Sequence, residues 1–153
     1  MSVIDTMVTA STKLTDSSSD PYPVDFFYGM DEWKTIDTMD QDKDFIYVDP
    51  ISGRIPAKDS GFLREDYSIS LLFGRCVSLD LSKEQERDII WQIRPYALQY
   101  LRRLLAETNT NGAKLFFPLE DGSIREVRKF LATNVYGVNI EFTLKERFPS
   151  ETC

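Results

Sequence analysis

The chain has 153 residues, a formal net charge of −7, 42% hydrophobic residues and 28% charged residues. This length fits one domain over residues 1–153, and the hydrophobic content excludes a wholly disordered chain. The acidic charge argues against a general nucleic-acid-binding protein, in which a basic patch would attract the phosphates.

The sequence lacks the marks of a secreted or membrane protein. Residues 1–15 contain no basic segment followed by an apolar one, and no run of 18 apolar residues occurs along the chain. Cys76 and Cys153 do not form the CxxC spacing of metal and redox sites, which favours a reducing compartment. We therefore expect a soluble protein that has no membrane partner.

Residues 1–20 are expected to form a short helix and a polar linker. The polar stretch that runs from Thr15 to Pro21 should end the helix. Four apolar residues share one helical face: Val3, Ile4, Met7 and Val8.

Two strands are expected in the next part of the chain. Residues 26–30 are aromatic and favour a short strand, which Gly29 limits. Phe45–Val48 is a continuous apolar stretch closed by Asp49 and Pro50, a pattern typical of a central strand buried on both faces.

Residues 51–66 lack a hydrophobic period and predict a long loop, a kind of segment that often reaches a partner. Phe62 and Leu63 are the candidate interface residues in this loop. Residues 148–153 are expected to form a flexible C-terminal tail.

Two segments alternate between apolar and polar residues, which predicts half-buried antiparallel strands at 67–73 and 138–144. Between them, residues 114–119 and 123–130 flank the turn-forming Glu120–Gly122 and predict a hairpin. Proline cannot donate to a ladder, so Pro118 would confine its strand to an edge.

The clearest predicted element is a helix from about Ser82 to Glu107. Ser82 and Gln85 have the spacing of a capping box, and acidic residues near the start and arginines near the end suit the helix dipole. Pro95 lies in the middle, where it removes a backbone hydrogen bond, so we expect a kink or a division into two shorter helices.

The helix carries two apolar stripes. The first would cover the sheet and comprises Ile89, Ile93, Ala97, Tyr100, Leu101 and Leu104. The second repeats at seven-residue intervals and comprises Trp91, Leu98 and Leu105. Another layer of the same domain, such as the N-terminal helix, would cover the second stripe in one interpretation. In the other interpretation it is a subunit interface, where Trp and Arg are enriched.

Four arginines of the helix fit either interpretation: Arg87, Arg94, Arg102 and Arg103. They would contact phosphate or an acidic protein surface, or they would form an ordinary solvated face. The candidate interface residues on the helix are Trp91, Arg94, Leu98, Arg102 and Leu105.

Catalytic and metal-binding patterns are weak. Asp40, Asp42 and Asp44 resemble the start of a calcium-binding EF-hand loop, but Phe45 stands where the loop needs glycine and Ile51 where it needs glutamate. The chain has no histidine, which excludes Ser-His-Asp and Cys-His chemistry. A hydrolase based on two carboxylates stays open, but 25 acidic residues make chance pairs common, so such pairs are weak evidence for it. We expect no enzyme activity, no cofactor and no metal.

Several short sequence segments resemble those of the small tail-terminator or head-to-tail joining proteins of tailed bacteriophages, in particular of phages with Bacteroides-like hosts. These segments are Tyr47-Val-Asp-Pro50, Gly61-Phe-Leu-Arg-Glu-Asp-Tyr67, the Leu81-Ser82 helix start and Gly137-Val-Asn-Ile-Glu-Phe142. The likeness covers about residues 1–147. It implies an α+β subunit, with an antiparallel sheet covered by one long helix and a short N-terminal helix.

The resemblance also implies a place in the virion and a set of partners. The subunit would assemble with itself into a ring of six or twelve copies, next to other neck or tail proteins. DNA would pass through the ring without sequence-specific binding, and the acidic charge suits a channel that should not retain it. Residues 1–70 carry a net charge of −8 and residues 71–153 one of +1, so two unlike surfaces are available for ring contacts.

A second hypothesis comes from a different class of protein. A small acidic inhibitor would occupy a basic surface of a host protein, such as a nucleic-acid site. Acidity and small size fit this role equally well.

Overall fold

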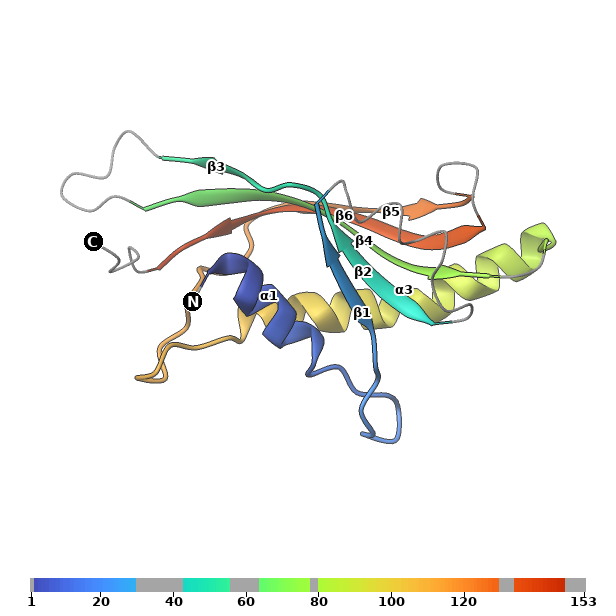
Figure 1. The fold of residues 1–153 in the computed structure, drawn as a ribbon, viewed down its shortest axis with the longest axis horizontal. Coiled ribbons are helices and arrows are strands. Elements are labelled where there is room, and N and C mark those ends of the chain that lie inside the picture. The colour runs from blue at the N-terminus through green and yellow to red at the C-terminus, as the bar shows by residue number, and fades with distance from the viewer. Residues whose placement is uncertain (1, 30–42, 56–63, 78–79, 130–133, 148–153) are drawn as a thin grey trace.

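The computed structural model describes residues 2–29, 43–55, 64–77, 80–129 and 134–147. The elements in this part of the chain are α1 (Val3–Ser11), β1 (Asp25–Tyr28), β2 (Asp44–Val48), β3 (Ser52–Arg54), β4 (Asp66–Cys76), α3 (Lys83–Leu105), β5 (Gly122–Val127) and β6 (Val135–Lys145). They form a six-stranded sheet with the strand order β1-β2-β4-β6-β5, and β3 pairs with β4 outside this order. Figure 1 shows α1 and α3 on the same side of the sheet.

The sheet is built around β4 and β6, which pair antiparallel over the full 11 residues of each strand. β2 and β5 are antiparallel to their neighbours, whereas β1 runs parallel to β2. The prediction of an α+β fold is therefore confirmed. The sheet is mostly antiparallel, with one parallel pair that the sequence pattern did not indicate.

The main core lies between the helices and one face of the sheet. Because side chains alternate along a strand, every second residue of β4 and β6 joins this core. Its fully buried members include Met7 and Ala10 of α1, Leu71 and Phe73 of β4, Ile90, Ile93, Ala97, Tyr100 and Leu104 of α3, and Tyr136, Val138 and Leu144 of β6.

A smaller cluster lies on the opposite face of the sheet and consists of Phe45, Tyr47, Leu72 and Val135. All five residues of β2 are buried. Phe45 and Tyr47 face this side of the sheet, whereas Ile46 and Val48 face the helices. The prediction of a strand buried on both faces is confirmed.

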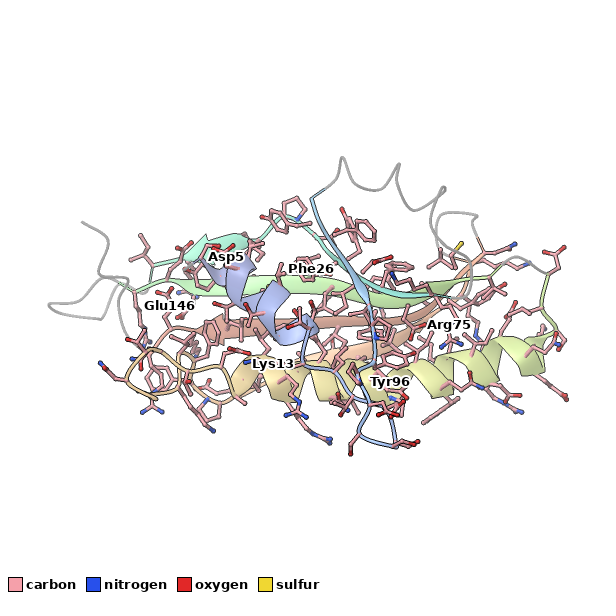
Figure 2. All side chains as sticks on the ribbon, turned by 60° about the horizontal axis from the view of Figure 1, so that its bottom comes forward. Asp5, Lys13, Phe26, Arg75, Tyr96 and Glu146 are labelled. Atoms are coloured by element: carbon pink, nitrogen blue, oxygen red, sulfur yellow. The ribbon has the colours of Figure 1, made fainter. Side chains whose placement is uncertain are left out.

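A buried ion pair joins β2 to β4. Arg75 Nε donates to Asp44 Oδ1 at 2.6 Å, and the Asp44 side chain is only 1% exposed. The Tyr22 hydroxyl also donates to Asp44, and the Tyr22 ring stacks on Tyr96 of α3 with 3.8 Å between the ring centroids. Arg75 and Tyr96 are labelled in Figure 2. Burial opposes the charge of Arg75, but the hydrogen bond and charge of Asp44 outweigh it and raise the pKa of the guanidinium. Asp44 therefore pairs with Arg75; Asp40 and Asp42, the other acids of the calcium-like pattern, lie outside the described residues.

Helix α1 begins at a complete capping box. The Ser2 hydroxyl accepts from the Asp5 backbone N–H, and the Asp5 carboxylate accepts from the Ser2 N–H. The Ser2 hydroxyl also donates to Asp5 Oδ2 at 2.8 Å, and this bond, together with the one from the Ser2 N–H, lowers the pKa of Asp5. The predicted helix is confirmed, although Val8, placed on its apolar face by the sequence pattern, is 39% exposed.

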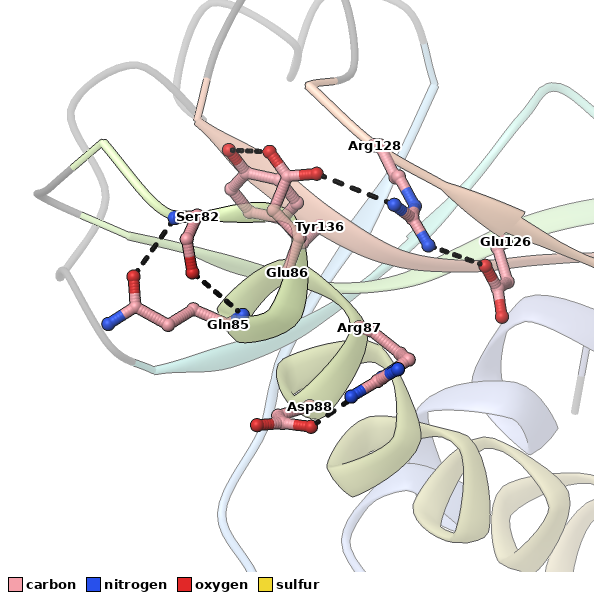
Figure 3. Close-up of polar contacts among 8 residues, drawn as sticks. All are labelled: Ser82, Gln85, Glu86, Arg87, Asp88, Glu126, Arg128 and Tyr136. Atoms are coloured by element: carbon pink, nitrogen blue, oxygen red, sulfur yellow. Dashed lines mark hydrogen bonds and ion pairs between the residues drawn. The ribbon is translucent and has the colours of Figure 1, made fainter.

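Helix α3 begins at the predicted cap, in which the Ser82 hydroxyl accepts from the Gln85 N–H and the Gln85 side chain accepts from the Ser82 N–H (Figure 3). The helix runs through Pro95 without interruption, so the predicted division into two helices is wrong. Pro95 is exposed, and water can therefore hydrate the Trp91 carbonyl, to which residue 95 cannot donate.

The predicted hairpin between residues 114–119 and 123–130 is also wrong. β5 pairs with β6, and the preceding segment touches β6 through an isolated bridge between Phe116 and Glu146. The turn signal at Glu120–Gly122 is local and does not fix which strand becomes the partner.

The long loop predicted at residues 51–66 contains a short strand, because β3 pairs with residues 66–68 of β4. The part of this loop that contains Phe62 and Leu63 lies outside the described residues, as does the predicted tail at 148–153.

Removal of one partner of the buried ion pair should destabilise the protein strongly. Arg75→Met leaves the Asp44 carboxylate buried without its cation, which costs about 3–5 kcal/mol in the free energy of unfolding. Urea denaturation followed by circular dichroism measures this loss. Arg87→Met is the matched control, because the Arg87–Asp88 pair is 59% and 67% exposed and should contribute less than about 1 kcal/mol. Equal losses in the two variants would contradict a structural role for the Asp44–Arg75 pair.

Alkaline pH should also weaken the fold. Burial raises the pKa of Tyr100, and burial together with a nearby carboxylate raises that of Tyr22, Tyr67 and Tyr136. Above about pH 10 the unfolded chain loses tyrosine protons that the folded chain keeps, so the free energy of unfolding falls as pH rises. Urea denaturation between about pH 9 and pH 11 measures the slope, and Tyr100→Phe should make it shallower. An unchanged slope in Tyr100→Phe would contradict this assignment.

Candidate interaction surface

Helix α3 presents three sides, and the first packs against the sheet. Ile90, Ile93, Ala97, Tyr100 and Leu104 are each fully buried in the main core. The predicted stripe differs at its start, because Ile90 takes the buried position and Ile89 is half-buried.

The segment from α1 to Tyr22 packs against the second side of α3. Lys13 Nζ lies 2.6 Å from a Glu107 carboxylate oxygen just beyond the end of α3, and the Tyr100 hydroxyl donates to the Met7 carbonyl at 3.1 Å. The Gln99 side chain exchanges hydrogen bonds of 2.8 and 3.0 Å with the Thr15 backbone. These contacts fix α1 and its linker to α3, and Lys13 is labelled in Figure 2.

The third side of α3 faces outward and carries four of the predicted interface residues. Trp91 is 56% exposed and Leu98 is 37% exposed. The Arg94 guanidinium carbon lies 5.2 Å from the centre of the Trp91 ring, a cation–π distance, and Arg102 is exposed one turn beyond Leu98. We call Trp91, Arg94, Leu98 and Arg102 the exposed α3 face. Leu105, the fifth candidate, is half-buried and packs against the main core instead.

The exposed α3 face is basic although the chain is acidic. Between Ile89 and Ala106 the sequence contains Arg94, Arg102 and Arg103 and no acidic residue. Within the described ranges, no carboxylate lies within 4.0 Å of these three guanidinium groups. The interpretation that the domain's own layers cover the second stripe holds for Leu105, whereas the described residues leave Trp91 and Leu98 exposed.

The opposite face of the sheet holds an open groove of about 550 Å³. Strand pairing places Ser68 beside Thr143 and Ser70 beside Glu141 on this face. We call it the sheet groove, and its lining residues are Asp49, Pro50, Ser52, Ser68, Ile69, Ser70, Asp121, Gly122, Ser123, Glu141, Phe142 and Thr143. Three carboxylates and several hydroxyls line it, and no basic residue is among these lining residues.

The sheet groove was not among the sites predicted from the sequence. The polar positions of the two alternating segments indicated a solvent-facing side of the sheet, which is the side where the groove lies. Asp49 and Asp121, however, come from connections between strands. The pairing of β2 with β4, of β4 with β6 and of β6 with β5 brings them to the groove that Glu141 also lines.

The groove carboxylates do not favour a hydrolase. A carboxylic acid that donates a proton at neutral pH is usually held in a buried, apolar site. Asp49, Asp121 and Glu141 are all exposed, and Arg125 Nη2 lies 3.8 Å from Glu141 Oε1.

A second buried carboxylate holds the start of α3 against the sheet. Arg128 Nη1 lies 3.6 Å from Glu86 Oε2, and the Tyr136 hydroxyl donates to Glu86 Oε1 at 3.4 Å (Figure 3). Burial and the nearby Glu86 charge raise the pKa of Tyr136. The cluster joins α3, β6 and the residue after β5, which is a structural role.

No cluster of three potential metal ligands occurs among the described residues, and neither α1 nor α3 is both long and apolar enough to span a bilayer. A scan against protein-family models and a search of curated proteins found no match to the chain.

The exposed α3 face should be dispensable for folding. Trp91→Glu or Leu98→Glu removes a side chain that is more than a third exposed, and a glutamate there lies near Arg94, so the free energy of unfolding should change by less than about 0.5–1 kcal/mol. Leu104→Ala is the matched control on the buried side of α3 and should cost about 2–5 kcal/mol. Urea denaturation compares the three variants. A loss in Trp91→Glu as large as that in Leu104→Ala would mean that residue 91 belongs to the core.

Proposed function

We propose that this protein is a structural subunit that binds further copies of itself through the exposed α3 face. The observation that carries the proposal is the exposure of Trp91 and Leu98 between arginines on a helix whose other two sides are packed. Exposed Trp and Leu side chains cost free energy in water, and an interface would remove them from it.

The composition of the exposed α3 face supports a protein partner over a general solvated surface. Trp and Arg are enriched in the interfaces between proteins and are frequent among the residues that contribute most to binding. Arg94 already lies over the Trp91 ring, so the two side chains are partly ordered before binding. Less side-chain entropy is then lost when the interface forms.

We further propose that the assembly is a ring of six or twelve copies at the head–tail junction or upper tail of a tailed bacteriophage. The resemblance to tail-terminator and head-to-tail joining proteins supports this location. Neighbouring neck or tail proteins would bind other surfaces of the ring, and DNA would pass through it. The acidic net charge suits a channel wall that releases DNA.

Assembly should depend on the exposed α3 face. Sedimentation velocity of the purified chain over a concentration series should detect oligomers, and Trp91→Glu or Leu98→Glu should abolish them while the monomer stays folded. Val8→Glu is the matched control, because Val8 on α1 is 39% exposed, similar to Leu98 at 37%, but lies outside the proposed interface. Val8→Glu should assemble like the unaltered chain.

The phage location has a separate test. Mass spectrometry of purified particles from the source phage should detect the chain in several copies per particle. A chain that is strictly monomeric and absent from particles would contradict the proposal. Recovery of a one-to-one complex with a basic host protein would instead support the inhibitor hypothesis.

A further inference from the structure

The exposed α3 face and the sheet groove lie on opposite sides of the molecule. α3 packs on the face of β4 that carries Leu71 and Phe73, whereas the groove is lined by Ser68 and Ser70 of the same strand. Because successive side chains of a strand point to opposite faces, the sheet separates α3 from the groove. Figure 1 shows α3 on one side of the sheet.

The two surfaces carry opposite charges. The exposed α3 face has arginines at positions 94 and 102, without acidic residues in that stretch of the helix. The sheet groove has carboxylates at positions 49, 121 and 141, without basic residues among its lining. Guanidinium groups present five donors, and carboxylate and hydroxyl oxygens accept them, so the donor and acceptor types also match.

The sizes of the two surfaces are compatible. An α-helix with its side chains is about 10–12 Å wide. The groove lies over β3, β4, β6 and β5, and four neighbouring strands span roughly 14 Å at about 4.8 Å between strands. A second helix on this face would repeat the arrangement that α3 already has with the first face. Pro50 adds an apolar surface to the lining.

We propose that the exposed α3 face of one copy docks into the sheet groove of the next copy. This inference rests on the proposed function and adds the second half of the interface. The contact is heterologous, since a helix face of one copy meets a sheet face of its neighbour. Each copy keeps one face of each kind available, so assembly continues in one direction and forms a closed ring when the rotation between copies permits.

The existing ion pair at the groove does not prevent this docking. Arg125 and Glu141 approach to 3.8 Å, but their side chains are 73% and 55% exposed. An exposed pair of this kind contributes little and is easily exchanged for another cation. Asp121 accepts a hydrogen bond from the next residue's N–H at 2.7 Å through one oxygen, and a carboxylate has a second oxygen to offer.

The test uses two charge-reversed variants of the full chain. The helix variant is Arg94→Glu/Arg102→Glu, and the groove variant is Asp49→Lys/Glu141→Lys. All four positions lie on exposed or half-exposed surface, and circular dichroism and urea denaturation verify that each variant is folded. If the groove variant does not fold, Asp49→Lys alone takes its place, because that side chain lies in a connection outside the strands.

Each variant alone should lose at least about tenfold in the association constant measured by sedimentation velocity. An equal mixture of the two should regain oligomers, because every helix face then meets a groove of opposite charge. Raising the salt concentration should weaken the assembly of the unaltered chain, since salt screens these charges. The control is Lys114→Glu, an exposed charge reversal outside both surfaces, which should assemble normally.

The outcomes separate this inference from the proposed function. A groove variant that assembles like the unaltered chain, beside a helix variant that does not, overturns the docking into the groove and leaves self-association through α3 intact. Two variants that both assemble normally overturn both. A chain that stays monomeric at every concentration overturns the inference, and the particle measurement then decides the proposed function separately.

Discussion

The 11-residue antiparallel pairing of β4 with β6 is the constraint on which the rest of the structure depends. It fixes a two-residue alternation that sends Leu71, Phe73 and Val138 toward the helices and Ser70 and Glu141 away from them. A register shift of one residue would bury the polar set and expose the apolar one. The apolar core under α3 and the polar groove on the far face therefore come from the same ladder.

α3 depends on that ladder for its orientation, and the N-terminal segment then determines what remains exposed. Stacking of Tyr22 on Tyr96 and hydrogen bonds between Thr15 and Gln99 occupy the flank of the helix. Among the described residues, the side with Trp91 and Leu98 stays exposed. The buried Asp44–Arg75 pair reinforces this arrangement, because its neighbour Tyr22 contacts both the ion pair and α3.

Local signals in the sequence predicted the local structure well, and the errors arose where a long-range contact decided the outcome. The capping box at Ser82 and the alternation in β4 and β6 need only neighbouring residues, and both were predicted. The predicted hairpin does not form because β5 pairs with β6 instead of with residues 114–119. The helix runs through Pro95 because Ile93 and Ala97 on either side are buried and hold it in place. The sheet groove could not be predicted, since Asp49, Asp121 and Glu141 are distant in sequence and meet only in the folded sheet.

Charge is distributed unevenly over the surface of this acidic chain. Concentrating arginines without acids in the second half of α3 makes the remainder of the surface more acidic than the net charge of −7 alone indicates. In the proposed assembly, the basic face of one copy would attract the acidic face of the next in the head-to-tail orientation. The helix that organises the core thus also determines the direction in which copies would add, because the same sheet that buries one side of α3 separates its outer side from the groove.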